Sequence, residues 1–84
     1  MISFEDTAFT QYWQWAKDDK NIFKKITALI NDIRRDPFDG IGKPEPLKHD
    51  LSGLWSRRIT DEHRLIYQVL PDQVIIHSCK FHYK

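Results

Sequence analysis

The segment "LWSRRITDEHRLIYQVLPDQVIIHSCKF", residues 54–81, decides the fold because it repeats one pattern three times. Runs rich in β-branched and aromatic residues, at 54–59, 64–70 and 74–81, are separated by the polar stretches "TDEH" and "PDQ". Such runs are typical of strands, and connections this short join neighbouring strands in opposite directions. This segment therefore predicts an antiparallel three-stranded meander.

Two helices are predicted upstream of the meander, because apolar residues recur there at intervals of three and four. The apolar stripe of the first helix consists of Phe9, Tyr12, Trp13 and Ala16. The stripe of the second helix consists of Ile22, Ile26, Leu29, Ile30 and Ile33. Asp18 or Asp19 can cap the second helix, and the short connection predicts an antiparallel hairpin of the two.

A helical hairpin followed by a meander predicts an α+β fold. The hairpin packs on one face of a small twisted, mainly antiparallel β-sheet and leaves the other face open. Residues 2–4 are predicted to add a short strand. At 84 residues the chain is long enough for one modest core, so residues 1–84 are predicted to form a single domain.

Alternation along the predicted strands sorts side chains between the helices and the open face. In the last strand, the set facing the helices is Ile75, His77, Cys79 and Phe81, and the set facing away is Ile76, Ser78, Lys80 and His82. In the middle strand, the core set is Leu65, Tyr67 and Val69, and the open set is Arg64, Ile66 and Gln68. Arg58 joins the open face only if the first turn holds an odd number of residues or a bulge, which the sequence leaves open.

The three tryptophans are predicted to have different surroundings. Trp13 belongs to the stripe of the first helix and is expected in the core. Trp55 is expected to fill the core or to contact a second copy of the chain. Trp15 lies off the stripe, so exposure there would indicate a surface for a partner.

Composition excludes several classes of function. A formal net charge of only +1 argues against a polycation that coats nucleic acid. The lone Cys79 cannot form an intramolecular disulfide, and four scattered histidines do not predict a zinc site, so no metal or cofactor is expected. Because no stretch reaches about 18 apolar residues and no signal peptide opens the chain, a cytoplasmic protein without a membrane partner is predicted.

The loop before the meander and the open face of the sheet together carry side chains suited to breaking an RNA phosphodiester. Glu45, on a loop stiffened by two prolines, could deprotonate a ribose 2′-hydroxyl. Arg58 and Arg64 could grip the phosphate and stabilise a pentacovalent phosphorane, and His82 could protonate the leaving 5′-oxygen. Because any small domain offers some Glu, His and Arg near a sheet, these residues alone do not assign the function.

The segment "GKPEPLKHDLSGLWSRRITDEHRLIY", residues 42–67, and the terminal "CKFHYK" closely resemble the YoeB branch of the RelE-type bacterial toxins. The upstream "RRDPFDGIGKPEPLKH" and the helix spacing match as well, so the resemblance covers nearly the whole chain. The resemblance implies a metal-independent endoribonuclease, an mRNA interferase that cuts mRNA in the A site of the translating 70S ribosome. It also implies a homodimer neutralised by a YefM-type antitoxin, with operator DNA bound only through the antitoxin.

The motif positions carry the family's site residues onto this chain. The resemblance implies that the catalytic residues are Glu45, Arg64 and His82. It implies that RNA binding or transition-state support comes from Lys48, Arg58 and Tyr83. One departure is Lys84, which extends the chain beyond the His-Tyr end that is usual in the family.

Simpler interpretations of the same residues remain open. Arg58 and Arg64 could pair with Asp61 or Glu62, which is how most sheet arginines are used. The other four site residues could be ordinary surface side chains. Arg57 points away from the open face and is either a structural residue or a ribosome contact.

Two alternative functions also remain open. The first is a ribonuclease that cuts free RNA without the ribosome. The second is a non-catalytic toxin of the ParE type, which poisons gyrase. Glu45, Lys48 and the His82-Tyr83 terminus favour the nuclease, because a gyrase binder would not need them.

Overall fold

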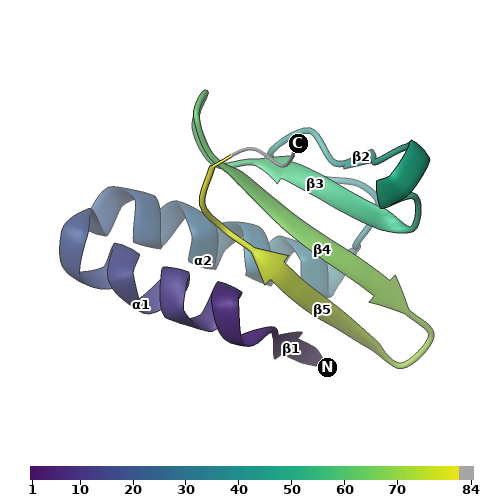
Figure 1. The fold of residues 1–84 in the computed structure, drawn as a ribbon, viewed down its shortest axis with the longest axis horizontal. Helices are drawn as coiled ribbons and strands as arrows, with labels where there is room; N and C mark the ends of the chain where they lie inside the picture. The colour runs from purple at the N-terminus through teal and green to yellow at the C-terminus, as the bar shows by residue number, and fades with distance from the viewer. Residues whose placement is uncertain (82–84) are drawn as a thin grey trace.

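The computed structural model of the chain describes residues 1–81, and its two helices lie side by side on one face of a sheet (Figure 1). Helix α1 spans Asp6–Asp18 and helix α2 spans Lys20–Arg35. The carboxylate of Asp19 accepts hydrogen bonds from the backbone N–H groups of Asn21 and Ile22, at 3.1 and 3.2 Å. Asp19 is therefore the cap of α2, and the predicted hairpin is confirmed.

The sheet has five strands in the order β1-β5-β4-β3-β2. The strands are β1 (Ile2–Phe4), β2 (Glu45–Pro46), β3 (Leu54–Arg58), β4 (Arg64–Leu70) and β5 (Gln73–Ser78), with a short 3-10 helix, η1 (His49–Leu51), after β2. β3, β4 and β5 form the predicted antiparallel meander, and β1 pairs with β5 in parallel. The predicted α+β fold is confirmed, while the two-residue strand β2 had not been predicted because two prolines flank and end it.

The register between β3 and β4 places Arg58 on the open face. Arg58 lies directly opposite Arg64, so the intervening turn, residues 59–63, holds an odd number of residues. Ser56 lies opposite Ile66 on the same face. The condition that the sequence left open is thereby met.

A β-bulge in β5 reverses the predicted facing of part of that strand. Tyr67 pairs with Ile76, but Ile66 pairs with Ser78, so His77 is an extra residue between the two pairs. Ile76 is consequently buried in the core, whereas the ring of His77 contacts Gln68 at 3.1 Å on the open face. The prediction that Ile75 and His77 face the helices is wrong, because it assumed uninterrupted alternation back from Cys79, which is indeed buried.

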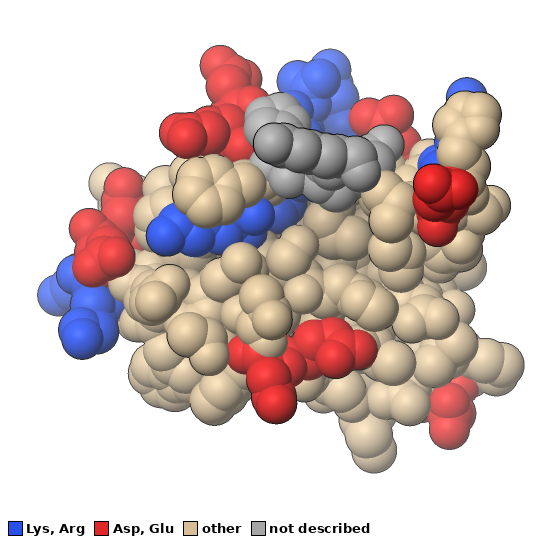
Figure 2. Space-filling view, in the orientation of Figure 1, with Lys and Arg blue, Asp and Glu red and all other residues tan. Residues whose placement is uncertain are grey.

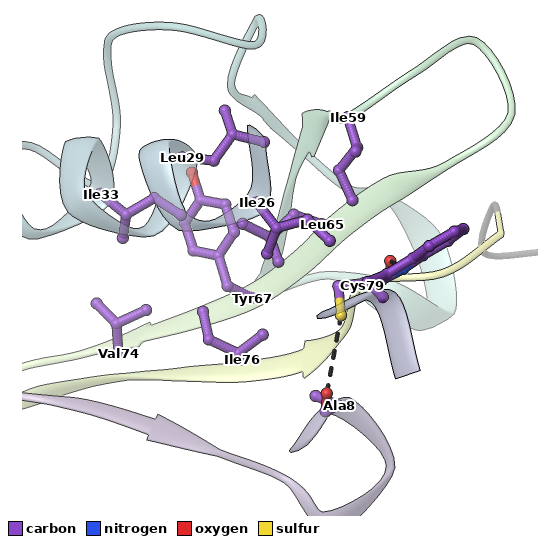
Figure 3. Packing of buried hydrophobic residues seen from close by; sticks show 11 residues of the cluster. Ala8, Ile26, Leu29, Ile33, Ile59, Leu65, Tyr67, Val74, Ile76 and Cys79 are labelled. Carbon is purple, nitrogen blue, oxygen red and sulfur yellow. Dashed lines mark hydrogen bonds between the residues drawn. The ribbon is translucent and has the colours of Figure 1, made fainter. Parts of the chain in front are cut away.

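The core lies between the helices and the inner face of the sheet (Figure 3). Leu65 and Tyr67 of β4 point toward the stripe of α2, whose most buried members are Ile26, Leu29 and Ile33. The predicted stripe of α2 is therefore confirmed. Each of these side chains is at most 1% exposed, and burial on this scale stabilises the fold by roughly 1.5–3 kcal/mol per large aliphatic residue.

The inward face of α1 differs from the predicted stripe. Ala8 and Trp15 are the buried residues of this helix, whereas Phe9 and Trp13 are 51% and 54% exposed. The prediction that Trp13 lies in the core is thus wrong, and Trp15 is buried, so the exposure that would have indicated a partner surface there is not found. The indole N–H of Trp15 donates to the carbonyl of Cys79 at 2.9 Å, so a polar partner in the core selects this tryptophan for burial.

Neither helix among residues 1–81 is long and apolar enough to cross a membrane.

Candidate functional site

A pocket of about 310 Å³, which we call the β2 pocket, opens on the uncovered face of the sheet, at the edge formed by β2. Its lining consists of Glu45, Pro46, Leu47, Lys48, His49, Ser56 and Arg64. The pocket therefore brings together three of the six residues singled out in the sequence, namely Glu45, Lys48 and Arg64. A larger hollow of about 830 Å³ lies near the β4–β5 turn, but its charged side chains are only Arg34 and Asp72.

Hydrogen bonds at both ends hold the strand that carries Glu45. The N–H of Arg58 donates to the carbonyl of Gly42 at 2.6 Å, and the N–H of Leu47 donates to the carbonyl of Leu54 at 2.8 Å. Glu45 itself lies opposite Ser56, so its exposed carboxylate stands on the open face. The loop thus presents this carboxylate from a backbone that is fixed to β3.

Arg57 organises the segment that leads from α2 to this strand. The side chain is fully buried, and its guanidinium donates to the Asp32 carboxylate at 2.5 Å and to the Tyr67 hydroxyl at 3.1 Å. It also donates to the carbonyls of Asp36 and Ile41, at 2.7 and 3.1 Å. Of its two predicted roles, burial selects the structural one and excludes contact with a ribosome.

The carboxyl group of Asp32, the acid bound to Arg57, is held ionised. Hydrogen bonds from Arg35, from Arg57 and from the N–H of Ile41 lower the pKa of Asp32 to about 2. The Tyr67 hydroxyl donates to the carbonyl of Pro37 at 2.7 Å, and burial raises the pKa of this phenol. Asp32 therefore compensates the charge of Arg57 throughout the physiological range.

Arg58 and Arg64 face each other across β3 and β4 without a carboxylate partner among residues 1–81. One guanidinium nitrogen of Arg64, Nη1, donates to the carbonyls of Thr60, His63 and Asp61, at 2.6, 3.1 and 3.2 Å. The predicted alternative of ion pairs with acids of this turn is wrong, because the turn offers Arg64 its backbone. Like charges placed directly opposite destabilise a sheet, so this pair is suited to an anionic ligand.

The remaining predicted site residues are placed differently. Arg58 is exposed beside the pocket and is not part of its lining. His82 and Tyr83 lie outside the described residues, as does Lys84. His49 lines the pocket although the sequence had given it no role, and its position next to Lys48 was the available signal.

Charge is scattered over the described part of the face shown in Figure 2, where small basic and acidic groups stand among large uncharged areas. Within residues 1–81, no group of three or more His, Cys, Asp or Glu side chains could hold a metal ion. Burial raises the pKa of the Cys79 thiol to about 12, so this cysteine is not a nucleophile at neutral pH. The candidates for acid–base chemistry and for anion binding are therefore the charged and titratable side chains of the β2 pocket.

Solved structures define the class of this protein. The chain resembles the YoeB/ParE toxin from Agrobacterium tumefaciens with a TM-score of 0.94 and 42% identity, over 98% of each chain. It resembles the YoeB of the dimer from Staphylococcus aureus with a TM-score of 0.90 and 47% identity, over 98% of this chain and 95% of the other. The fold is the RelE-like fold of small bacterial toxins.

Sequence relatives give the family within that class. A family model for the YoeB-like toxin of bacterial type II toxin–antitoxin systems matches residues 4–83. Toxin YoeB of Escherichia coli K12 is 55% identical over 82 residues, which is 98% of both proteins. The chain belongs to the family of YoeB-like toxins of bacterial type II toxin–antitoxin systems, and the resemblance seen in its motifs is confirmed.

Proposed function

We propose that this toxin is a ribosome-dependent endoribonuclease, an mRNA interferase that cuts mRNA in the A site of the 70S ribosome and so inhibits translation. Its family membership supports a toxic role, and the β2 pocket supports the chemistry. The observation that carries the proposal is the meeting of Glu45, Lys48 and Arg64 in one pocket, beside an Arg58 that has no carboxylate partner among residues 1–81. A phosphodiester is an anion that two opposed arginines can hold together.

The proposed reaction is general acid–base cleavage within the RNA. The Glu45 carboxylate takes the proton of a ribose 2′-hydroxyl, and the 2′-oxygen forms a bond to the adjacent phosphorus. Arg64 and Arg58 stabilise the charge of the phosphorane, with Lys48 as a further cation. The bond from phosphorus to the 5′-oxygen then breaks, which leaves a 2′,3′-cyclic phosphate and a 5′-hydroxyl end.

The leaving 5′-oxygen needs a proton, and we assign its donation to His82, with Tyr83 stacking on a base. Both residues lie outside the described residues, so these two assignments rest on the family motif. Phe81, the last described residue, accepts a hydrogen bond from the backbone N–H of Arg64. No cofactor enters this scheme.

The ribosome is proposed to position the substrate. The pocket measures only about 310 Å³, and the chain carries a formal net charge of only +1. A protein with so small a site and so weak an electrostatic attraction depends on an external scaffold to hold RNA in a reactive geometry.

Two protein partners are also proposed. One S. aureus relative is a YoeB dimer, and another structure is a heterotetrameric YoeB–YefM complex, in which YoeB is 46% identical to this chain with a TM-score of 0.90, over 99% of this chain and 97% of the other. By likeness to them, this toxin forms a homodimer and is neutralised by a YefM-type antitoxin. Operator DNA is bound only through that antitoxin.

The test is primer extension on an mRNA paused at a defined codon on purified ribosomes, beside the same mRNA free in solution. Wild-type protein should cut only within the A-site codon. Glu45→Gln should cut about 10²- to 10⁴-fold more slowly, the usual range for a lost general base. Glu5→Gln is the matched control because Glu5 is exposed and precedes α1, away from the pocket, and it should cut at the wild-type rate.

Three results would contradict the proposal. Cleavage by Glu45→Gln at the wild-type rate would remove Glu45 from the mechanism. Equal cleavage of free and ribosome-bound mRNA would indicate a ribosome-independent ribonuclease. No cleavage of either RNA would favour a non-catalytic toxin of the ParE type.

A further inference from the structure

His63 directly precedes Arg64, a lining residue of the β2 pocket, and is almost completely buried, with 7% of the residue exposed. Its ring stands edge-on to the indole of Trp15, with centroids 4.8 Å apart, and lies 5.6 Å from the ring of Phe81. The proposed cleavage reaction gives this histidine no role. A buried imidazole between two aromatic rings either fills space or makes a specific hydrogen bond.

The hydrogen bond exists and is directed at the end of the described chain. The N–H of Phe81 donates to Nδ1 of His63 at 2.8 Å. The carbonyl of Phe81 accepts from the N–H of Arg64 at 3.1 Å. Both backbone polar groups of Phe81 are therefore fixed, one by His63, which precedes β4, and the other by Arg64, its first residue.

The residues before Phe81 are anchored as well. The carbonyl of Cys79 accepts from the Trp15 indole at 2.9 Å, and the backbone N–H of Cys79 donates to the side chain of Gln11 at 2.8 Å. Residues 79–81 thus leave the end of β5 along a path fixed by α1 and by the start of β4. Packing alone would not require so many directed contacts.

The backbone of Phe81 also has a conformation that needs support. Its φ of 62° lies in the left-handed region, which side chains other than glycine rarely adopt. Such a conformation persists where surrounding contacts determine it, and it is often found beside functional sites. Here the determining contacts are those from His63 and Arg64.

The same histidine also shapes the turn that orients Arg64. The carbonyl of His63 accepts from the N–H groups of Ile59 and Thr60, at 3.0 and 3.2 Å. That carbonyl also lies 3.1 Å from Nη1 of Arg64. His63 is therefore hydrogen-bonded both to the guanidinium of Arg64 and to the backbone of Phe81.

We propose that His63 is a positioning residue for Arg64, because its Nδ1 fixes the backbone of Phe81, whose carbonyl in turn accepts from the N–H of Arg64. This inference rests on the proposed function, because it concerns the group assigned to stabilise the phosphorane. The restraint passes from the imidazole through Phe81 to the first residue of β4, which carries the guanidinium of the pocket. The acceptor form requires that Nδ1 carries no proton, which leaves the N–H on Nε2, the nitrogen that lies 3.7 Å from Glu62.

Two substitutions separate the hydrogen bond from the packing. In His63→Asn the amide oxygen, like Nδ1, is two bonds from Cβ, so it can still accept from Phe81 while the ring contacts are lost. In His63→Phe the ring is kept and the acceptor is lost. A positioning role predicts that the asparagine variant is the more active, whereas a packing role predicts that the phenylalanine variant is.

The first measurement is single-turnover cleavage of ribosome-bound mRNA. We expect His63→Phe to be slowed on the order of 10²-fold at saturating ribosomes, because small misplacements of a catalytic group have effects of this size. We expect His63→Asn to be at least tenfold faster than His63→Phe, with the same ribosome concentration for half-maximal rate. Equal rates for the two variants, or a faster phenylalanine variant, would overturn the proposal.

The second measurement is amide hydrogen exchange at Phe81, which does not depend on activity. Exchange should be fast in His63→Phe and close to the wild-type rate in His63→Asn. If Phe81 in His63→Phe exchanged at the wild-type rate, the proposal would be overturned. If the variants showed the expected exchange rates but the wild-type protein cut no RNA, only the proposed function would be contradicted. If the phenylalanine variant does not fold, His63→Gln replaces it, because its amide oxygen is three bonds from Cβ and misses the position of Nδ1.

Discussion

At the scale of single residues, Arg64 joins two tasks. Its backbone N–H holds Phe81, while its guanidinium lines the pocket and is oriented by three carbonyls of the preceding turn. Those bonds all come from one nitrogen, Nη1, and within residues 1–81 the other guanidinium nitrogens make no hydrogen bond, so they remain for a ligand. A fixed guanidinium of this kind stabilises developing charge without reorganisation during the reaction.

Arg64→Lys should therefore impair cleavage although it keeps the positive charge. An ammonium group can neither contact three turn carbonyls nor hold two phosphate oxygens as a planar fork does. We expect a loss of about 10²- to 10³-fold in the single-turnover rate, as for the removal of one oxyanion donor, with little change in melting temperature. Arg34→Lys, an exposed substitution in α2, is the control, and wild-type cleavage by Arg64→Lys would contradict this role.

Cys79 shows how burial silences a reactive residue. Desolvation raises the pKa of its thiol to about 12, and the reactive species is the thiolate. The folded protein at pH 8 should therefore react with a disulfide reagent at least 100-fold more slowly than the protein unfolded in guanidinium. Labelling of the folded protein at the rate of a free thiol would show that this part of the core opens readily.

At the scale of elements, the ion pair between Asp32 and the buried Arg57 joins α2 to β3 and to the loop that leads to Glu45. Because the folded pKa of Asp32, about 2, lies below the unfolded value of about 3.9, this acid stabilises the fold above about pH 4. The contribution is lost as the pH falls from there toward 2. Removal of the acid leaves a buried guanidinium without its counter-charge, which is costly at neutral pH.

Asp32→Asn should accordingly be less stable than wild type at pH 7, and the difference should shrink between about pH 4 and pH 2. Urea unfolding midpoints measured across that range will test this expectation. Asp18→Asn, a substitution of an exposed acid at the end of α1, is the control and should not show the same convergence. A stability difference that stays constant with pH would mean that these contacts do not lower the pKa of Asp32.

At the scale of the whole molecule, the two faces of the sheet have separate tasks. The helices cover one face and supply the core (Figures 1 and 3). The other face carries the β2 pocket and the opposed arginines. Residues 79–81 connect the two, because Cys79 is bonded to Trp15 in the core and Phe81 is bonded to Arg64, which lines the pocket. Stability and the proposed chemistry can therefore be altered by different substitutions.

The sequence by itself determined the features that depend on local pattern. The period of α2, the three runs of the meander and their short turns predicted the α+β fold, because residues a few positions apart already report helix or strand. The motif around Glu45 and the motifs around Arg58 and Arg64 indicated the family. The single N-cap of α2 at Asp19 was also among the predicted alternatives.

Only the tertiary structure decided the features that depend on contacts between distant segments. The bulge at His77 reversed the alternation of β5, and the carbonyl of Cys79 selected Trp15 rather than Trp13 for burial. The register that opposes Arg58 to Arg64 was likewise set by strand pairing. Each outcome is a choice among locally equivalent arrangements, and the packing of the whole chain makes that choice because no neighbouring residue distinguishes between them.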